Sequence, residues 1–192
     1  MHLMRAAFIP FVVLSAFVWR SWPDGSPIEF TMEGVGYIML MLGVAVRLWA
    51  TLYIGGRKSR ELITDGPYSM CRNPLYVGTM LLAIGASLCL ENILLLAATL
   101  LIFVPVHAYA VVLEERRLAE AFGAEFVAYR QRVPRFLFSF RHYCSNKTVN
   151  VSADILLRCA FTLSFIVAIP LIEELVEMLH ANGLLPVLWR PF

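Results

Sequence analysis

Two adjacent carboxylates, Glu114 and Glu115, lie where a long apolar run gives way to a basic segment. Residues 113–136 read LEERRLAEAFGAEFVAYRQRVPRF, which predicts a helix that continues out of the membrane. At about 100° per residue, the two acids flank an apolar stripe, and Arg116 and Arg117 point away from it. The stripe consists of Leu118, Phe122 and Phe126. Buried acids need partners, so these two could pair with nearby arginines or bind a cationic ligand.

A second segment with unusual side chains lies earlier, at residues 65–78, and reads DGPYSMCRNPLYVG. Pro74 suits the first turn of a helix, with Asn73 as its N-cap. Tyr68 and Tyr76 have the character of aromatic residues at a membrane interface. By itself this segment fits a capped loop that enters a membrane as well as it fits a binding site.

The composition predicts a membrane protein. Of the 192 residues, 59% are hydrophobic and 16% are charged, with a mean hydropathy of +0.71. A soluble domain has about 45–50% apolar and about 25% charged residues. The net charge of +2 gives no reason to expect a nucleic-acid partner. The cysteines and histidines are scattered without metal-ligand spacing, so we expect neither a disulfide framework nor a metal site.

The apolar runs predict an all-α protein with about five transmembrane helices. Residues 6–19 end without a small-residue cleavage site, so we expect a retained first helix. Residues 34–54 can cross a hydrocarbon core of about 30 Å. Residues 75–113 are too long for one crossing and predict two helices joined by a polar turn at Glu91. The run at residues 155–172 predicts a fifth helix, followed by an acidic, more amphipathic tail.

Charge predicts the orientation of these helices. The arginines and lysines concentrate in residues 55–72 and 114–147, which lie on one side of the membrane by the helix count. The loops on the other side carry mainly acidic residues. The positive-inside rule therefore places the N-terminus and both basic segments in the cytoplasm. We expect one membrane domain over residues 1–192, without internal repeats.

Taken together, the two segments resemble the isoprenylcysteine carboxyl methyltransferase and phospholipid methyltransferase family of integral membrane enzymes. The resemblance covers about residues 35–138, and the order and spacing of its motifs agree with that family. Residues 145–192 are then a C-terminal extension with an additional membrane helix. The matching motifs are Gly66-Pro67-Tyr68, Arg72-Asn73-Pro74-Leu75-Tyr76-Val77-Gly78, Glu114-Glu115-x-x-Leu118, Phe122-Gly123 and Tyr129-x-x-Arg132-Val133-Pro134.

The resemblance implies a helical bundle whose cytosolic segments, residues 55–76 and 113–136, enclose S-adenosyl-L-methionine. A lipid-like acceptor would enter from the bilayer, and the bacterial members of the family suggest a bacterial inner membrane. A carboxylate could bind the methionine ammonium, an arginine its carboxylate, and aromatic rings the adenine or the sulfonium. The implied catalytic residues are Arg72, Glu115 and Arg132. The implied cofactor-binding residues are Tyr68, Arg72, Asn73, Tyr76, Glu114, Glu115, Tyr129 and Arg132.

Methyl transfer from a sulfonium is a direct displacement, so such an enzyme mainly aligns the acceptor with the methyl group in a water-poor pocket. A carboxylate, phosphate or tertiary amine can accept the methyl group without losing a proton. A thiol, hydroxyl or protonated amine needs a base, for which Glu115 or a tyrosine is a candidate. Asn73 stands where the prenylcysteine branch typically has histidine, which favours a phospholipid-type or bacterial member over an enzyme for prenylated proteins.

Two other functions fit parts of the sequence. Membrane sterol reductases resemble this family in their cytosolic C-terminal part and use NADPH, but they are usually longer. A non-catalytic scaffold or small transporter is the other alternative, because Arg47 and His107 fall inside predicted membrane spans. Arg47 could equally be a structural tie, or could reach the interface from near its helix end.

Overall fold

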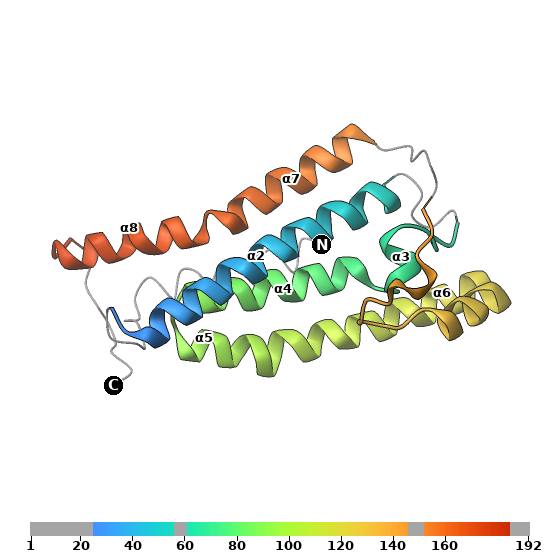
Figure 1. Cartoon of the computed structure of the whole chain (residues 1–192), viewed down its shortest axis with the longest axis horizontal. Coiled ribbons are helices and arrows are strands. Elements are labelled where there is room, and N and C mark those ends of the chain that lie inside the picture. Colours follow the sequence, from blue (N-terminus) through green and yellow to red (C-terminus); the bar gives the residue numbers. More distant parts are fainter. Residues whose placement is uncertain (1–24, 56–60, 146–151, 185–192) are drawn as a thin grey trace.

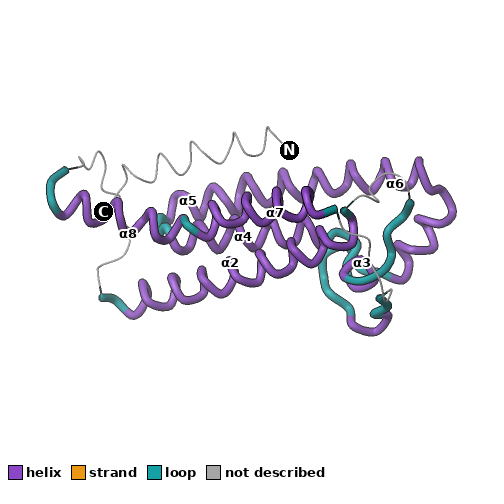
Figure 2. The backbone as a smooth tube through the Cα atoms, turned by 90° about the horizontal axis from the view of Figure 1, so that it is seen from above, coloured by secondary structure: helices purple, strands orange, loops and turns teal. Residues whose placement is uncertain are grey.

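The computed structural model describes residues 25–55, 61–145 and 152–184, and over these ranges every regular element is a helix (Figure 1). The predicted helix at residues 6–19 lies outside the described residues. The helices run back and forth along one long axis (Figures 1 and 2). Their order is α2 (Pro27–Ile54), α3 (Pro67–Met70), α4 (Pro74–Cys89), α5 (Ile93–Ala98), the π-helical η1 (Thr99–Phe103), α6 (Val104–Arg132), the 3₁₀ turn η2 (Phe140–His142), α7 (Ala153–Val167) and α8 (Ile169–Ala181).

The predicted all-α membrane fold is confirmed, whereas a count of five crossings is not. Among the described residues, three helical stretches are long and apolar enough to cross a bilayer: Pro27–Ile54, Ile93–Arg132 and Ala153–His180. The predicted third crossing is the apolar α4, which has only 16 residues. At about 1.5 Å per residue, α4 is somewhat shorter than a hydrocarbon core of about 30 Å.

Helix α2 begins earlier than the apolar run at residues 34–54 predicts. Ser26 caps the helix by accepting a hydrogen bond from the Glu29 backbone N–H at 3.1 Å, and the Glu29 carboxylate accepts one from the Ser26 N–H at 3.2 Å. Pro27 occupies the first turn. This capping box starts the helix about two turns ahead of the continuous apolar run, in a segment that contains Glu29, Thr31 and Glu33.

Helices α2 and α4 pack closely because glycines face each other across their contact. A Cβ atom added at Gly36 would lie 2.7 Å from Cys89 Sγ and 3.0 Å from the Gly85 carbonyl oxygen. A Cβ atom added at Gly43 would lie 3.0 Å from the Gly78 carbonyl oxygen. Small residues at such contacts let membrane helices approach backbone to backbone, where dispersion contacts stabilise them.

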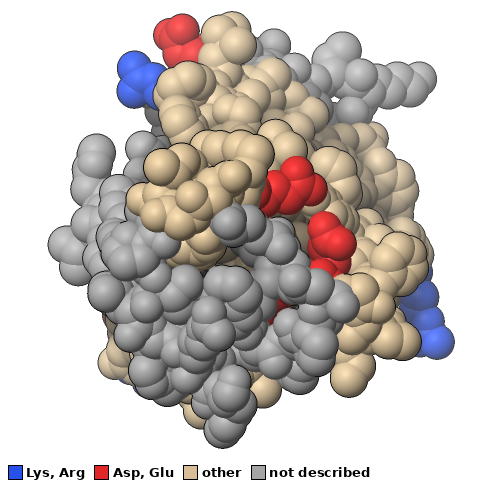
Figure 3. Space-filling view, turned by 90° about the vertical axis from the view of Figure 1, so that its left-hand side faces the viewer, with Lys and Arg blue, Asp and Glu red and all other residues tan. Residues whose placement is uncertain are grey.

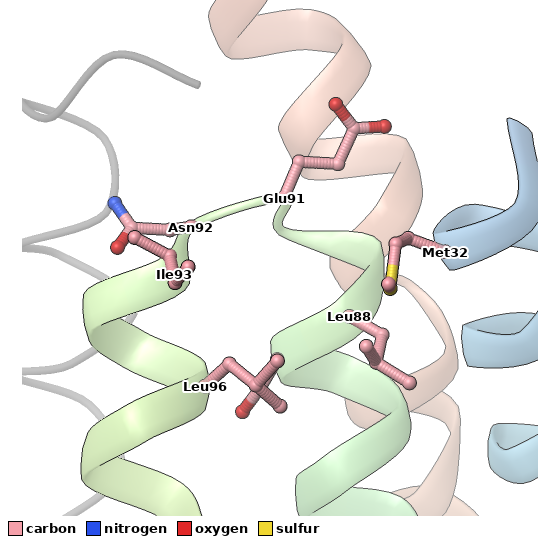
Figure 4. Close-up of a pocket in the computed structure, with 7 residues that line it drawn as sticks. Met32, Leu88, Glu91, Asn92, Ile93 and Leu96 are labelled. Carbon is pink, nitrogen blue, oxygen red and sulfur yellow. The ribbon is translucent and has the colours of Figure 1, made fainter. Parts of the chain in front are cut away.

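The predicted hairpin at residues 75–113 is confirmed. Glu91 turns the chain with a φ of 48°, and the Asn92 side chain caps α5 by accepting hydrogen bonds from the N–H groups of Leu94 and Leu95. Figure 4 shows this turn beside a small pocket that Met32 of α2 also lines. Figure 3 views the molecule from this end, where acidic side chains reach the surface near the middle of the view.

The C-terminal extension completes the bundle. Helices α7 and α8 are separated only at Ala168, just ahead of Pro170, and together they form the predicted last apolar helix. Leu163 and Ile169 are 3% and 4% exposed and belong to a core cluster with Leu40 of α2 and other residues of α4 and α5. The extension therefore packs on the same helices that position the candidate site.

Candidate functional site

The two motif segments meet at one end of the bundle, the right-hand end in Figure 1. A kink at Gly123 makes this possible, because its φ of 49° and ψ of −121° turn the last part of α6 back on the first. No atom lies within 4 Å of a Cβ built there, so glycine is required by the backbone conformation and not by space. The returned segment places Phe126 and Tyr129 in a buried cluster, and the Tyr129 hydroxyl donates to the Tyr68 carbonyl oxygen at 2.7 Å.

The chain after α6 runs alongside α3 and holds it in place. It leaves the helix at Val133 in an extended conformation, and Pro134 follows. Three backbone hydrogen bonds join the segments: Arg72 N to Pro134 O at 2.9 Å, Ser139 N to Met70 O at 3.0 Å, and Gly66 N to Cys144 O at 2.7 Å. Residues far apart in the sequence thus form one polar layer at the end of the bundle.

Glu115 is the centre of this layer. It is 7% exposed, and its Oε1 accepts a hydrogen bond from Asn73 Nδ2 at 2.9 Å. Its Oε2 accepts two hydrogen bonds from Arg135, from Nε at 3.0 Å and from a terminal nitrogen at 2.8 Å. Arg72 approaches the same oxygen at 3.6 Å. Both carboxylate oxygens are therefore occupied, as a buried charge requires.

Two buried polar atoms of the first motif segment have no hydrogen-bond partner among the described residues: the Tyr68 hydroxyl and Arg72 Nε. Buried polar atoms are paired in the large majority of cases, so such atoms indicate a place where a ligand or water completes the site. Burial raises the pKa of the Tyr68 hydroxyl well above its ordinary value, so Tyr68 remains a protonated donor at physiological pH.

Glu114 differs from its neighbour. Its side chain is 29% exposed, and the ion pair nearest to it is with Arg117, one turn along the helix, at 3.9 Å. It is close enough to Tyr76 to act electrostatically on that hydroxyl. Tyr76 is half-buried and packs edge-on against His107, with 5.8 Å between ring centroids. Glu114 is thus more exposed than Glu115 and lies outside the Glu115 network.

The predicted site residues form two groups of contacts, and one residue stands apart. Arg72, Asn73 and Glu115 contact one another, with Tyr129 and Tyr68 joined next to them, whereas Tyr76 and Glu114 lie near each other. Arg132 is exposed and its Nε donates to the Ala128 carbonyl oxygen of its own helix at 3.4 Å. Arg135, which the sequence did not single out, makes the contact with Glu115 instead. Pro134 lies between Arg132 and Arg135 and stops the helix there. The sequence signal that could have identified Arg135 is its position directly after this proline.

Asn73 stands at the N-cap position of α4 as predicted, but its side chain makes no capping hydrogen bond. Its Nδ2 donates to Glu115 Oε1 at 2.9 Å and also reaches the Arg135 carbonyl oxygen at 3.3 Å. A cap would need Asn73 Oδ1 to accept from a backbone N–H of α4, whereas the charged Glu115 binds the Nδ2 donor and draws the amide across to α6. Asn73 therefore links the two motif segments and does not cap α4. Over the described ranges, no group of three acidic, histidine or cysteine side chains could hold a metal ion.

Comparison with known proteins identifies the family of the chain. A sequence model of the family described as phospholipid methyltransferase matches residues 32–125. The cobalt-zinc-cadmium resistance protein CzcN of Cupriavidus metallidurans is 31% identical over 177 residues, which are 92% of this chain and 82% of that protein. The nickel-cobalt-cadmium resistance protein NccN of Alcaligenes xylosoxydans is 37% identical over 65% of this chain and 58% of its own length.

Methyltransferases are also among the relatives. Protein-S-isoprenylcysteine O-methyltransferase B of Arabidopsis thaliana is 28% identical over 54% of this chain, and the match spans 57% of the plant protein. The Xenopus laevis enzyme is 30% identical over 59% of this chain and 42% of its own length. No solved structure matches. The helical bundle with these motifs defines a membrane methyltransferase, and the chain belongs to the isoprenylcysteine and phospholipid methyltransferase family.

Proposed function

We propose that the protein transfers a methyl group from S-adenosyl-L-methionine to a lipid-like acceptor at the cytoplasmic face of the membrane. The observation that carries the proposal is the buried Glu115 network. It ties both motif segments together, and two buried polar atoms of these segments, Tyr68 Oη and Arg72 Nε, have no partner in the described part of the chain. The charges of Glu115 and its arginines are already paired with each other. The remaining polar atoms of the layer are therefore suited to bind a small charged molecule.

The donor set fits the chemical groups of this cofactor. Glu114 would bind the methionine ammonium, because Glu115 already has its full set of donors. Arg72 would bind the methionine carboxylate through its buried Nε. Tyr68 would donate a hydrogen bond, and the ring of Tyr76 would lie against the adenine or the sulfonium. Tyr129 would keep Tyr68 in place through its bond to the backbone, and Arg132 remains a candidate at the exposed rim.

The protein's part in the reaction is then alignment and exclusion of water. A sulfonium methyl donor supplies an electrophilic methyl group that an acceptor attacks directly. Glu115 is fixed by its contacts with Asn73, Arg72 and Arg135, and these contacts hold α6 in place relative to α4. The site is therefore organised before the ligands bind. Burial of Tyr68 and Tyr129 at 7% and 3% exposure keeps water from the reacting groups. Glu115, with both oxygens occupied, acts as a positioning residue and not as a free base.

A lipid-like acceptor is supported by the surface that leads to the site. Helix α6 exposes large apolar side chains ahead of Glu114, among them Val106 and Tyr109 at 61% exposure each. These residues face hydrocarbon when the helix crosses a bilayer, so an amphiphile can reach the polar layer without entering water. The acceptor would thus come from the membrane and the cofactor from the aqueous side.

The cofactor is tested by the thermal stability of the purified protein in neutral detergent. S-adenosyl-L-methionine should raise the melting temperature in a concentration-dependent way, and NADPH should not. Glu114→Gln should weaken cofactor binding about tenfold to a hundredfold, because it removes a charge-assisted contact. Protection by NADPH alone would favour the sterol-reductase alternative. Protection by neither ligand would contradict the proposal.

Sidedness is tested by labelling from outside the cell. In the orientation we propose, Ser139→Cys next to η2 is cytoplasmic and stays unlabelled by a membrane-impermeant maleimide. Ser26→Cys, at the start of α2, lies at the opposite end of the bundle and reacts. A cysteine-free background is needed for both. Labelling of residue 139 but not of residue 26 would place the site away from the cytosolic cofactor.

A further inference from the structure

The segment that follows α6, residues 133–145, combines aromatic and basic side chains, and we call it the strap. It reads VPRFLFSFRHYCS and contains three phenylalanines, one tyrosine and two arginines, but no acidic residue. The end of α6 that leads into it adds Arg130 and Arg132, so residues 126–145 carry four arginines and no acid. The candidate site uses Arg135 of the strap but none of its aromatic side chains.

Contacts with α2 and α4 fix the depth of the strap. The ring of Tyr143 lies against that of Trp49, with 6.3 Å between the centroids. Trp49 is about 7.5 Å before the end of α2 at Ile54, and α2 is long and apolar enough to cross a bilayer. The Arg135 carbonyl oxygen accepts from Asn73 Nδ2 at 3.3 Å, directly ahead of the apolar α4. The strap is therefore level with the ends of these apolar helices, beside α3 at the right-hand end of Figure 1.

Several side chains of the strap are exposed instead of packing on the protein. Leu137 and Phe140 are 78% and 77% exposed, and Tyr143 is about half exposed. Arg141, which lies between the two aromatic residues, is exposed as well. Over the described residues, neither Arg130 nor Arg141 forms an ion pair. A surface of this kind is complementary to a partner that is both apolar and negatively charged.

We propose that the strap docks on anionic phospholipids of the leaflet at this end of the bundle, and that docking stabilises the candidate site. Its apolar side chains enter the headgroup region, while Arg141 and the arginines at the end of α6 bind the phosphates. Arginine and aromatic residues are also common at protein–protein interfaces. The depth of the strap favours lipid, because side chains exposed beside the ends of membrane-crossing helices meet the headgroups of the bilayer.

Docking affects the candidate site because the strap is hydrogen-bonded to both motif segments. The Pro134 carbonyl oxygen accepts from the Arg72 N–H at 2.9 Å. Arg135 belongs to the strap and donates to Glu115 Oε2 at 2.8 Å. Lipid that holds the strap in place makes local opening of these bonds rarer. Anionic lipid is therefore an effector of the site that acts through the strap.

Docking is measured with an environment-sensitive maleimide dye on Cys144, the exposed cysteine of the strap. The protein is placed in nanodiscs of phosphatidylcholine, or of equal amounts of phosphatidylcholine and phosphatidylglycerol, and a Cys144→Ser protein corrects for dye elsewhere. In the phosphatidylglycerol discs, the emission should shift to shorter wavelength and spin-labelled lipid should quench it more strongly. High salt should reduce this difference. Equal docking in both discs would overturn the assignment to anionic lipid, and a dye that stays in water in both would overturn docking itself.

Variants locate the contact. Arg141→Gln should lower the ratio of docked to free strap about fivefold in the phosphatidylglycerol discs and leave it unchanged in phosphatidylcholine. Arg141→Lys keeps the charge and should dock as the wild type does. Phe140→Ser should lower the ratio about tenfold in both discs, because it removes an apolar anchor. Arg116→Gln is the matched control, since Arg116 is an exposed arginine of α6 outside the strap. An equal loss in the Arg116 variant would show general attraction between charges and overturn the proposal.

The link to the candidate site is measured by amide hydrogen exchange of the wild-type protein in the same nanodiscs. The N–H groups of Gly66 and Arg72 donate to carbonyl oxygens of the strap. Exchange in residues 66–72 should therefore be about fivefold slower in the phosphatidylglycerol discs, whereas exchange in the middle of α2 should be the same in both. Docking with unchanged exchange in residues 66–72 would refute the link. Neither measurement contains a methyl donor, so this proposal and the proposed function fail independently.

Discussion

Replacing Glu115 by glutamine tests whether the carboxylate of Glu115 has a structural role or binds a ligand. The substitution keeps the shape of the side chain and removes its charge. Four donor contacts reach the wild-type carboxylate: Asn73 at 2.9 Å, Arg135 at 3.0 Å and 2.8 Å, and Arg72 at 3.6 Å. In the variant, the amide nitrogen of glutamine would face a donor and could not accept from it.

The expected cost follows from the exposure of the two arginines. The Arg135 side chain is 43% exposed and can turn to water, whereas the Arg72 side chain is 12% exposed and cannot. Losing a charge-assisted hydrogen bond costs about 1.5–3 kcal/mol, and leaving a buried charge unpaired costs about 3–5 kcal/mol. Because Arg135 can relax, we expect the free energy of unfolding to fall by about 2–3 kcal/mol. The corresponding melting temperature is lower by roughly 4–12 °C.

Thermal unfolding in neutral detergent, without cofactor, measures this effect. Glu120→Gln is the matched control, because Glu120 is an exposed acid on the same helix, and its melting temperature should not change. Glu114→Gln should also keep its melting temperature while losing cofactor affinity. A Glu115 variant as stable as the wild type, with cofactor affinity unchanged, would refute the view that this carboxylate organises the site.

Three further outcomes follow from the packing. Gly36→Ala should lower the free energy of unfolding by about 1–3 kcal/mol through overpacking. Gly34→Ala is the control, because no atom lies within 4 Å of a Cβ built there, and it should not change the stability. Equal melting temperatures of the two variants would contradict the close α2–α4 contact. Leu163→Ala should cost about 2–5 kcal/mol, and an unchanged stability would mean that α7 does not pack on the bundle. Burial raises the pKa of the Cys71 thiol to about 11, so little thiolate forms below that pH and maleimide at pH 7.5 should modify the exposed Cys144 and spare Cys71, as mass spectrometry of the peptides would report.

The course of the helices could be predicted from the sequence because the bilayer imposes it. Long apolar runs, the turn at Glu91 and the concentration of basic residues in two segments were sufficient to place both motifs at one end of the bundle. Helix boundaries were less predictable. The capping box of Ser26 and Glu29 extends α2 through a mixed segment that includes Glu29 and Glu33, since local hydrogen bonds as well as hydropathy decide where a helix begins.

Contacts at the candidate site depend on a backbone turn that hydropathy does not report. Gly123 appeared in the sequence as part of a motif, but only its positive φ folds the end of α6 back on itself. That turn, with Pro134, directs Arg135 toward Glu115 and leaves Arg132 in solvent. The different surroundings of Glu114 and Glu115 likewise follow from tertiary contacts, because adjacent residues on a helix differ by about 100° in direction.

The most direct test of the central claim is transfer of a labelled methyl group. The purified protein is incubated with methyl-tritiated S-adenosyl-L-methionine and a bacterial lipid extract, and the label is followed into the organic phase. Our account predicts labelled lipid with the wild-type protein and at least about tenfold less with Glu114→Gln, in line with a lost charge-assisted contact. Tight binding of the cofactor with no label in any lipid or protein fraction would contradict it.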